Sequence, residues 1–169
     1  MNVSVSGATI IRNGVKLGFP FIESIKSILP LCKEFIVCVG DSEDDTKQRI
    51  AEIYDPKIKI ISTRWDKNTR HGGQVLSEQT NTALAHCQGD FIFYLQADEA
   101  VHENDFEKIQ AALKYAKAHR EVEGIIFNYY HFYGSYYTIQ SGRNWYRQEV
   151  RIIRNHAGIH SHGDAQGFR

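Results

Sequence analysis

The 169-residue chain has the length of one domain, and its 42% hydrophobic and 24% charged residues are those of an ordinary globular protein. Its 20 basic and 20 acidic side chains balance, which argues against nucleic acid or anionic lipid as a partner. The sequence has no apolar run near the roughly 18 residues of a membrane span and no secretory signal pattern, and its three cysteines lie in apolar surroundings, as in reduced cytoplasmic proteins.

The predicted elements alternate between strands and helices along the chain. Strands are expected where β-branched or apolar runs are short, and helices where apolar residues recur at three- and four-residue spacing. In chain order the elements are a strand at 3–12, a helix at 21–29, a strand at 34–40, a helix at 42–54, a strand at 57–63, a helix at 75–87, a strand at 91–96, a helix at 105–119, and strands at 123–134 and 149–155.

This alternation predicts an α/β protein with helices on both faces of a mostly parallel sheet. Ligands of such sheets bind beyond the carboxyl ends of the strands. In this chain those ends carry polar clusters, which are Arg12-Asn13, Gly40-Asp41-Ser42, Arg64-Trp65-Asp66 and Gln96-Ala97-Asp98-Glu99. The sequence therefore predicts a binding site at one edge of the sheet.

Each polar cluster has two readings. Gly40-Asp41-Ser42 could bind a ligand through free amides at a helix start, or Ser42 could simply cap the helix with Asp45 completing a capping box. Asp98 with Glu99 could hold a hard divalent cation, or could begin a solvated loop. His71-Gly72-Gly73 could wrap a phosphate, although two glycines without a Walker lysine are weak evidence.

Two later segments are also open to two readings. The aromatic run from Tyr129 to Tyr137 could form a wall that stacks on sugars, or could be divided between the core and a site. Arg151 and Arg154, on the predicted strand at 149–155, could reach a phosphate from one face, or could be exposed strand residues.

The chain resembles family 2 glycosyltransferases, which have the GT-A fold and use nucleotide-activated sugars. The resemblance covers nearly the whole length and is closest to an uncharacterised bacterial branch. The similar segments are ATIIRNGVKLGFPFIESI, FIVCVGDSEDDT, GGQVLSEQTNTALAHCQGDFIFYLQADE with its D-x-D-like motif, and the acceptor-side NWYRQEVRIIRNHAGIHSHGDAQGF.

The resemblance implies a role for each candidate residue. Asp98 matches the second acid of the D-x-D motif and would hold a divalent cation, Mn²⁺ or Mg²⁺, that bridges the two phosphates of the donor. Asp164 is the candidate base that takes the proton of the acceptor hydroxyl, although a plain loop carboxylate is an equal reading. The residues expected to contact the nucleotide are Arg12, Gly40, Asp41, Ser42, Arg64, Gln96 and Ala97.

Two departures from the family pattern affect these roles. The first acid of D-x-D is Gln96, whose amide can bond a ribose hydroxyl but adds no charge to metal binding, so a weakly held cation is expected. The turn that commonly carries two adjacent aspartates reads Val39-Gly40, which leaves the base of the nucleotide open.

The resulting prediction is one GT-A domain over residues 1–169, cut short at its C-terminus, that moves a sugar from a nucleoside diphosphate sugar to an unknown glycan, lipid or small-molecule acceptor with inversion. It is expected to act in the cytoplasm or at the inner face of the membrane, with no prediction of its oligomeric state. The alternatives are a non-catalytic nucleotide- or glycan-binding module on the same fold and a nucleotidyltransferase, for which Ile11-Arg12-Asn13-Gly14 is too sparse in basic and glycine residues.

Overall fold

The computed structural model describes residues 2–66, 73–140, 142, 145–165 and 167–169. A six-stranded sheet runs through the molecule in the order β3-β2-β1-β4-β8-β5, and β3, β2, β1 and β4 pair in parallel. Strand β8 is antiparallel to both of its neighbours, β4 and β5. The strands are β1 (Val5–Ile11), β2 (Glu34–Val39), β3 (Ile58–Ser62), β4 (Phe91–Tyr94), β5 (Gly124–Asn128) and β8 (Gln148–Arg154).

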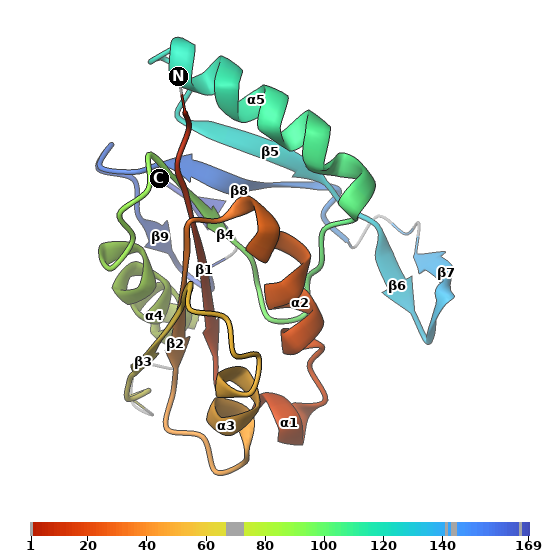
Figure 1. Ribbon diagram of the computed structural model, residues 1–169. Helices are drawn as coiled ribbons and strands as arrows, with labels where there is room; N and C mark the ends of the chain where they lie inside the picture. The colour runs from red at the N-terminus through yellow and green to blue at the C-terminus, as the bar shows by residue number, and fades with distance from the viewer. Residues whose placement is uncertain (1, 67–72, 141, 143–144, 166) are drawn as a thin grey trace.

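Helices cover both faces of this sheet (Figure 1). Alternate residues of β2 show the two faces: Phe35 and Val37 belong to the core cluster that includes α2 and α5, whereas Ile36 and Cys38 pack with α4. The predicted three-layer α/β/α fold with a mostly parallel sheet is therefore confirmed. The helices are α1 (Gly14–Leu17), α2 (Phe21–Ile28), η1 (Leu29–Leu31), α3 (Thr46–Ala51), α4 (Gln74–Ala85), η4 (Glu103–Asp105) and α5 (Phe106–Ala118).

The aromatic segment predicted as one strand at 123–134 divides into two. The chain leaves the main sheet after Asn128, at the end of β5, and then pairs with itself as the hairpin of β6 (His131–Tyr133) and β7 (Ser135–Gln140). Gly134 takes a positive φ of 69° at the turn, a conformation that glycine adopts without strain. Figure 1 shows this hairpin standing out from the body of the molecule. A second small sheet joins β9 (Ser161–His162) to β10 (Gly167–Phe168).

Ser42 does not cap a helix, so the capping-box prediction is wrong. Helix α3 begins at Thr46, and Asp44 accepts hydrogen bonds from the backbone N–H and the hydroxyl of Thr46. The hydroxyl of Ser42 instead accepts a 3.0 Å hydrogen bond from the backbone N–H of Asn13. Asn13 in turn accepts from the N–H of Glu43 at 2.7 Å. The acidic turn thus ties the loop after β2 to the loop after β1.

Candidate functional site

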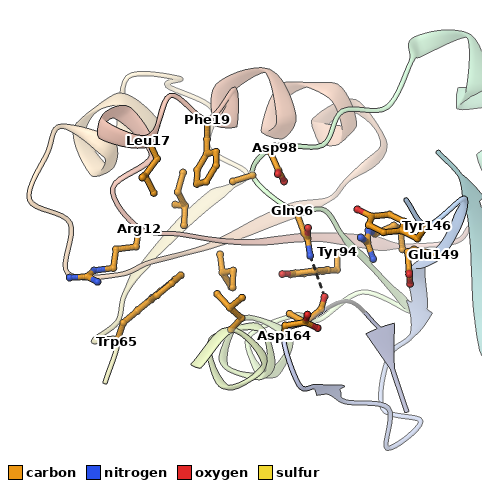
Figure 2. A pocket seen from close by; sticks show the side chains of 16 residues that line it. Arg12, Leu17, Phe19, Trp65, Tyr94, Gln96, Asp98, Tyr146, Glu149 and Asp164 are labelled. Carbon is orange, nitrogen blue, oxygen red and sulfur yellow. Dashed lines mark hydrogen bonds between the residues drawn. The ribbon is translucent and has the colours of Figure 1, made fainter. Parts of the chain in front are cut away.

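A cavity of about 410 Å³ lies beyond the carboxyl ends of β1 and β4, at the predicted edge of the sheet. Figure 2 shows Arg12 and Trp65 at one side of it, Tyr146 and Glu149 at the other, and Gln96 with Asp98 between them. The cavity is lined by Ile10, Ile11, Arg12, Leu17, Phe19, Trp65, Leu76, Tyr94, Gln96, Ala97, Asp98, Tyr146, Glu149, Arg151, Asp164 and Ala165.

Five of the nine predicted site residues line this cavity, namely Arg12, Gln96, Ala97, Asp98 and Asp164. They come from the ends of β1 and β4 and from the turn after β9, segments that are far apart in the sequence. The sequence reasoning missed Trp65, Tyr146 and Glu149 as wall residues.

The other four predicted residues lie around the cavity without lining it. Gly40 is buried against Trp65, and a Cβ at this position would come within 2.5 Å of the indole nitrogen. Asp41 forms a 3.2 Å ion pair with Arg12 and accepts a hydrogen bond from the backbone N–H of Trp65. These contacts hold two wall residues in place. The hydroxyl of Ser42 accepts a hydrogen bond from the backbone N–H of Asn13, in the loop after β1. Arg64 is exposed, and its backbone carbonyl accepts a hydrogen bond from the side-chain amide of Gln79.

The indole N–H of Trp65 is buried next to Gly40 and has no hydrogen-bond partner among the described residues. Buried polar groups normally have a partner, so this unsatisfied donor beside the cavity is unusual. In the segment His71-Gly72-Gly73, considered for a phosphate, His71 and Gly72 lie outside the described residues.

A buried ion pair crosses the floor of the site between Glu99, after β4, and Arg151 of β8. The guanidinium donates to both carboxylate oxygens, Nε at 2.9 Å and Nη2 at 2.7 Å, and Arg151 is only 1% exposed. Burial alone would lower the pKa of Arg151, but the hydrogen bonds and charge of Glu99 raise it above its usual value. The guanidinium therefore stays charged, and this bidentate geometry is the strong form of the contact.

The same pair corrects two expectations from the sequence. Glu99 is bound by Arg151 and accepts a 3.1 Å hydrogen bond from the backbone N–H of Gln96, so it stabilises the turn that carries Asp98. Arg151 and Arg154 do not share a face, because Arg151 lines the cavity whereas Arg154 lies against α5. Arg154 instead donates to the carbonyls of Ala116, His119 and Val122 at the end of α5. Neither arginine is an exposed strand residue.

Two tyrosines, Tyr129 and Tyr146, surround the ion pair. The guanidinium carbon of Arg151 lies 5.4 Å from the centre of the Tyr129 ring, and the hydroxyl of Tyr146 donates to Glu99 at 3.4 Å. Burial and the Glu99 carboxylate raise the pKa of Tyr146 to about 12, so its hydroxyl keeps its proton. Part of the aromatic run is therefore built into the site, while its later residues extend into the exposed β6–β7 hairpin.

Asp98 is the carboxylate of this cavity that fits a divalent cation. Burial and the nearby charge of Glu99 raise its pKa above the ordinary value, while Arg151 opposes that shift. No group of three or more histidine, cysteine or acidic residues converges as a metal site in the described part of the chain. These residues fit a cation that takes one protein carboxylate and fills its remaining positions with phosphate oxygens and water, as Mg²⁺ sites often do.

The comparisons with known proteins agree with this geometry. The model of the family described as "Glycosyl transferase family 2" matches residues 20–169. The chain belongs to this family. This membership confirms the predicted family and places the domain among transferases. Separately, no helix among the described residues is long and apolar enough to cross a membrane.

A curated relative and solved structures extend the comparison. The relative is the Escherichia coli UDP-Glc:alpha-D-GlcNAc-diphosphoundecaprenol beta-1,3-glucosyltransferase WfgD, 31% identical over 74 residues, or 44% of this chain and 26% of that protein. Staphylococcus aureus TarS 1–349 is similar in fold, with a TM-score of 0.50 and 21% identity over 73% of this chain and 34% of that one. Related TarS structures, at 22% identity and the same TM-score, contain UDP or UDP-GlcNAc. The chain thus spans about a quarter to a third of these proteins.

Proposed function

We propose that this domain transfers a sugar from a uridine diphosphate sugar to a hydroxyl group of an acceptor, with inversion at the anomeric carbon. The observation that carries the proposal is the position of Asp98 and Gln96 in the middle of the cavity, between a wall with Arg12 and Trp65 and a wall with acidic side chains. A nucleoside diphosphate sugar needs this sequence of contacts, from base and ribose through the diphosphate to the reacting sugar. The uridine nucleotide is proposed because WfgD is named for UDP-Glc and TarS structures contain UDP and UDP-GlcNAc.

The nucleoside is proposed to bind at the wall formed by Arg12 and Trp65. The indole ring of Trp65 offers a flat apolar surface in the cavity wall, and the Arg12 guanidinium offers hydrogen-bond donors. Gly40 and Asp41 act here as positioning residues, because they contact Trp65 and Arg12. Ser42 and Arg64 have no proposed contact with the nucleotide, since Ser42 binds Asn13 and the carbonyl of Arg64 binds Gln79.

The ribose and the diphosphate are proposed to bind at the end of β4. Gln96 donates a 3.3 Å hydrogen bond to the carbonyl of Ala165, which orients its amide so that the carbonyl oxygen can accept from a ribose hydroxyl. Asp98 would hold a Mn²⁺ or Mg²⁺ ion together with the phosphates. When bound, that ion supplies charge neutralisation for the leaving diphosphate. A single carboxylate holds such an ion weakly, so binding of metal and donor is expected to be interdependent.

The acceptor is proposed to enter from the wall that carries Tyr146, Glu149 and Asp164. An inverting transfer requires a group on that side that takes the proton of the attacking hydroxyl. The resemblance to the family assigns that role to Asp164, and this assignment stays a prediction. A lipid-linked glycan is a natural acceptor to test, because the name of WfgD specifies one. Work at the inner face of a membrane would suit such an acceptor.

Calorimetric titration with UDP and GDP, with and without Mn²⁺, tests the proposal. We expect UDP to bind in a metal-dependent way and Asp98→Ala to weaken that binding at least tenfold, since it removes the carboxylate ligand of the cation. Asp105→Ala, which removes an acid near α5 outside the cavity lining, is the matched control and should bind like the wild type. Metal-independent binding, or equal binding by the Asp98 variant, would contradict the proposed role of Asp98.

Turnover separates the enzyme from a binding module. The wild-type chain is incubated with UDP-glucose or UDP-N-acetylglucosamine, with water as the acceptor, and the released UDP is measured. Release of UDP supports a transferase. Tight UDP binding without any release would favour a non-catalytic nucleotide-binding module on the same fold.

A further inference from the structure

Glu149 is an acidic side chain in the wall of the cavity that the family resemblance leaves without a role. It lies on β8, two residues before Arg151, and both side chains line the cavity. Figure 2 places Glu149 beside Tyr146, across the cavity from Arg12 and Trp65. The side chain is only half-buried, which leaves it open to an incoming molecule.

The carboxylate of Glu149 makes no hydrogen bond or ion pair with any other residue that the structure describes. Its neighbour Arg151 is joined instead to Glu99 by two hydrogen bonds of 2.7 and 2.9 Å. Partly buried carboxylates are normally paired, because desolvation of an unpaired charge is unfavourable. An unpaired one in a binding cavity is typical of a group that is kept for a substrate.

The electrostatic surroundings of Glu149 favour binding of a proton. Burial raises its pKa above the ordinary value, the charges of Glu99 and Asp164 raise it further, and Arg151 opposes the shift. A carboxylate with a raised pKa is a better proton acceptor near neutral pH than an ordinary surface carboxylate. The geometry and the charge distribution therefore agree.

Asp164 is less well placed for the same task. The side chain of Asp164 is exposed. Its backbone packs closely on Gly73, the N-cap residue of helix α4, which has a positive φ of 72°. Solvent therefore reaches Asp164, whereas Glu149 is half-buried. Both carboxylates line the cavity, so a direct comparison between them is possible.

We propose that Glu149 is the general base of the transfer reaction and takes the proton of the attacking hydroxyl. This assignment rests on the proposed function. The acceptor oxygen forms a bond to the anomeric carbon, the bond from that carbon to the phosphate oxygen breaks, and the electron pair leaves with UDP. The hydroxyl proton moves to the Glu149 carboxylate and later to solvent. Asp164 then contributes negative charge and acceptor contacts, and is not the destination of the proton.

The test compares Glu149→Gln with Asp164→Asn, each of which removes one charge at nearly constant shape. Hydrolysis of UDP-glucose and UDP-N-acetylglucosamine in the presence of Mn²⁺ is measured, because water then serves as the attacking hydroxyl. We expect Glu149→Gln to lower kcat by about 10²- to 10⁴-fold, the usual contribution of a general base, with the donor KM and the Kd for UDP within about twofold of wild type. Asp164→Asn should lower kcat by no more than about tenfold, less than a general base contributes.

Two further variants distinguish a catalytic from a structural role. Glu149→Asp keeps the carboxylate one methylene further back and should recover part of the lost kcat. Glu123→Gln, at an exposed acid just before β5, should be indistinguishable from wild type. The thermal midpoint of Glu149→Gln should equal or exceed that of wild type, because the substitution removes an unpaired, partly desolvated charge.

The outcomes have distinct meanings. Loss of kcat in Asp164→Asn together with normal kcat in Glu149→Gln would overturn this inference and return the base to Asp164. A drop in the thermal midpoint and in UDP affinity of Glu149→Gln would show a structural residue and would also overturn it. Failure of the wild-type chain both to bind UDP and to release it would overturn the proposed function, and this inference with it.

Discussion

The two halves of the molecule bury their side chains to different extents. The half proposed to bind the donor (the donor half), residues 2–66 and 73–105, contains β1, β2 and β4, in which every residue is buried. The half proposed to meet the acceptor (the acceptor half), residues 106–140 and 145–169 where described, contains β7, in which every residue is exposed, and β6, which is exposed at Phe132 and Tyr133. Tyr137 is 99% exposed. The donor half is thus built as a fixed platform, while much of the acceptor half faces solvent.

Polar contacts near the site join the two halves, in addition to the pairing of β4 with β8. The ion pair of Glu99 and Arg151 connects the turn after β4 to β8, and Gln96 reaches the carbonyl of Ala165. On the opposite edge of the sheet, Lys117 of α5 binds Asp90 just before β4.

Arg151→Met should have the largest effect on stability. It leaves the carboxylate of Glu99, whose side chain is 9% exposed, buried without its partner. Breaking a buried ion pair in this way costs about 3–5 kcal/mol of the free energy of unfolding. Urea denaturation measures the change.

Two controls accompany Arg151→Met. The double variant Glu99→Gln with Arg151→Met should recover most of the loss, because no unpaired charge remains. Lys16→Met, which breaks the exposed pair with Glu43, should change the free energy by less than about 1 kcal/mol. Equal losses for the buried and the exposed pair would show that the contact between the halves contributes little.

This contact also marks the limit of what the sequence could predict. Short apolar runs and helical spacing identified every strand of the platform, because local patterns determine burial there. Asp98 was found because it follows a buried strand. The pairing of Glu99 with Arg151 was not, since 52 residues separate them and only the folded sheet brings them together. Ser42 was misread for the same reason, as its partner Asn13 belongs to another loop.

The acceptor half was harder to predict because its pattern is not that of a buried strand. The aromatic side chains between Tyr129 and Tyr137 were interpreted as strand or as wall residues, because aromatic side chains suit both. The turn at Gly134 and the independent β6–β7 sheet depend on the chain pairing with itself. Glu149 gave no motif, and only its place in the cavity wall drew attention to it.

Lowering the pH should weaken the contact between Asp90 and Lys117. The hydrogen bond from Lys117, with further bonds from Ser4, lowers the pKa of Asp90 from 3.8 to about 2. Because the folded-state pKa is depressed, this carboxylate stabilises the fold above about pH 4, and its contribution is lost as the pH falls toward 2. The shift corresponds to at most about 2 kcal/mol, which solvent at the 31%-exposed side chain reduces to about 1 kcal/mol.

Urea denaturation of wild type and Asp90→Asn between pH 2 and pH 7 measures this contribution. The two curves should differ at pH 7 and approach each other as the pH falls toward 2, where the wild-type carboxylate becomes protonated. A constant difference across this range would contradict the electrostatic origin of the stabilisation and indicate a loss of packing or hydrogen bonding instead.

Gln96→Asp should strengthen the metal site of the platform. It places a second carboxylate near Asp98, and additional ligand charge increases the affinity for hard cations. We expect Mn²⁺-dependent binding of UDP to tighten roughly tenfold, or about 1.4 kcal/mol. The comparison is made by calorimetry with Gln96→Asn, which keeps the shorter side chain without the charge. If both variants weaken binding equally, the bond from Gln96 to Ala165 matters more than charge.

The smallest effect on stability is expected for Tyr137→Ser in the acceptor half. Tyr137 is 99% exposed on β7, so the ring buries almost no area in the folded chain, and its backbone N–H bonds Ser135 whatever the side chain. The free energy of unfolding should change by less than about 0.5 kcal/mol. Phe93→Ala, at a fully buried ring of the platform, should instead cost about 3–5 kcal/mol. A loss near that size for Tyr137→Ser would mean that the hairpin is buried in solution against something else, and the contrast between a fixed platform and an open acceptor surface would then be wrong.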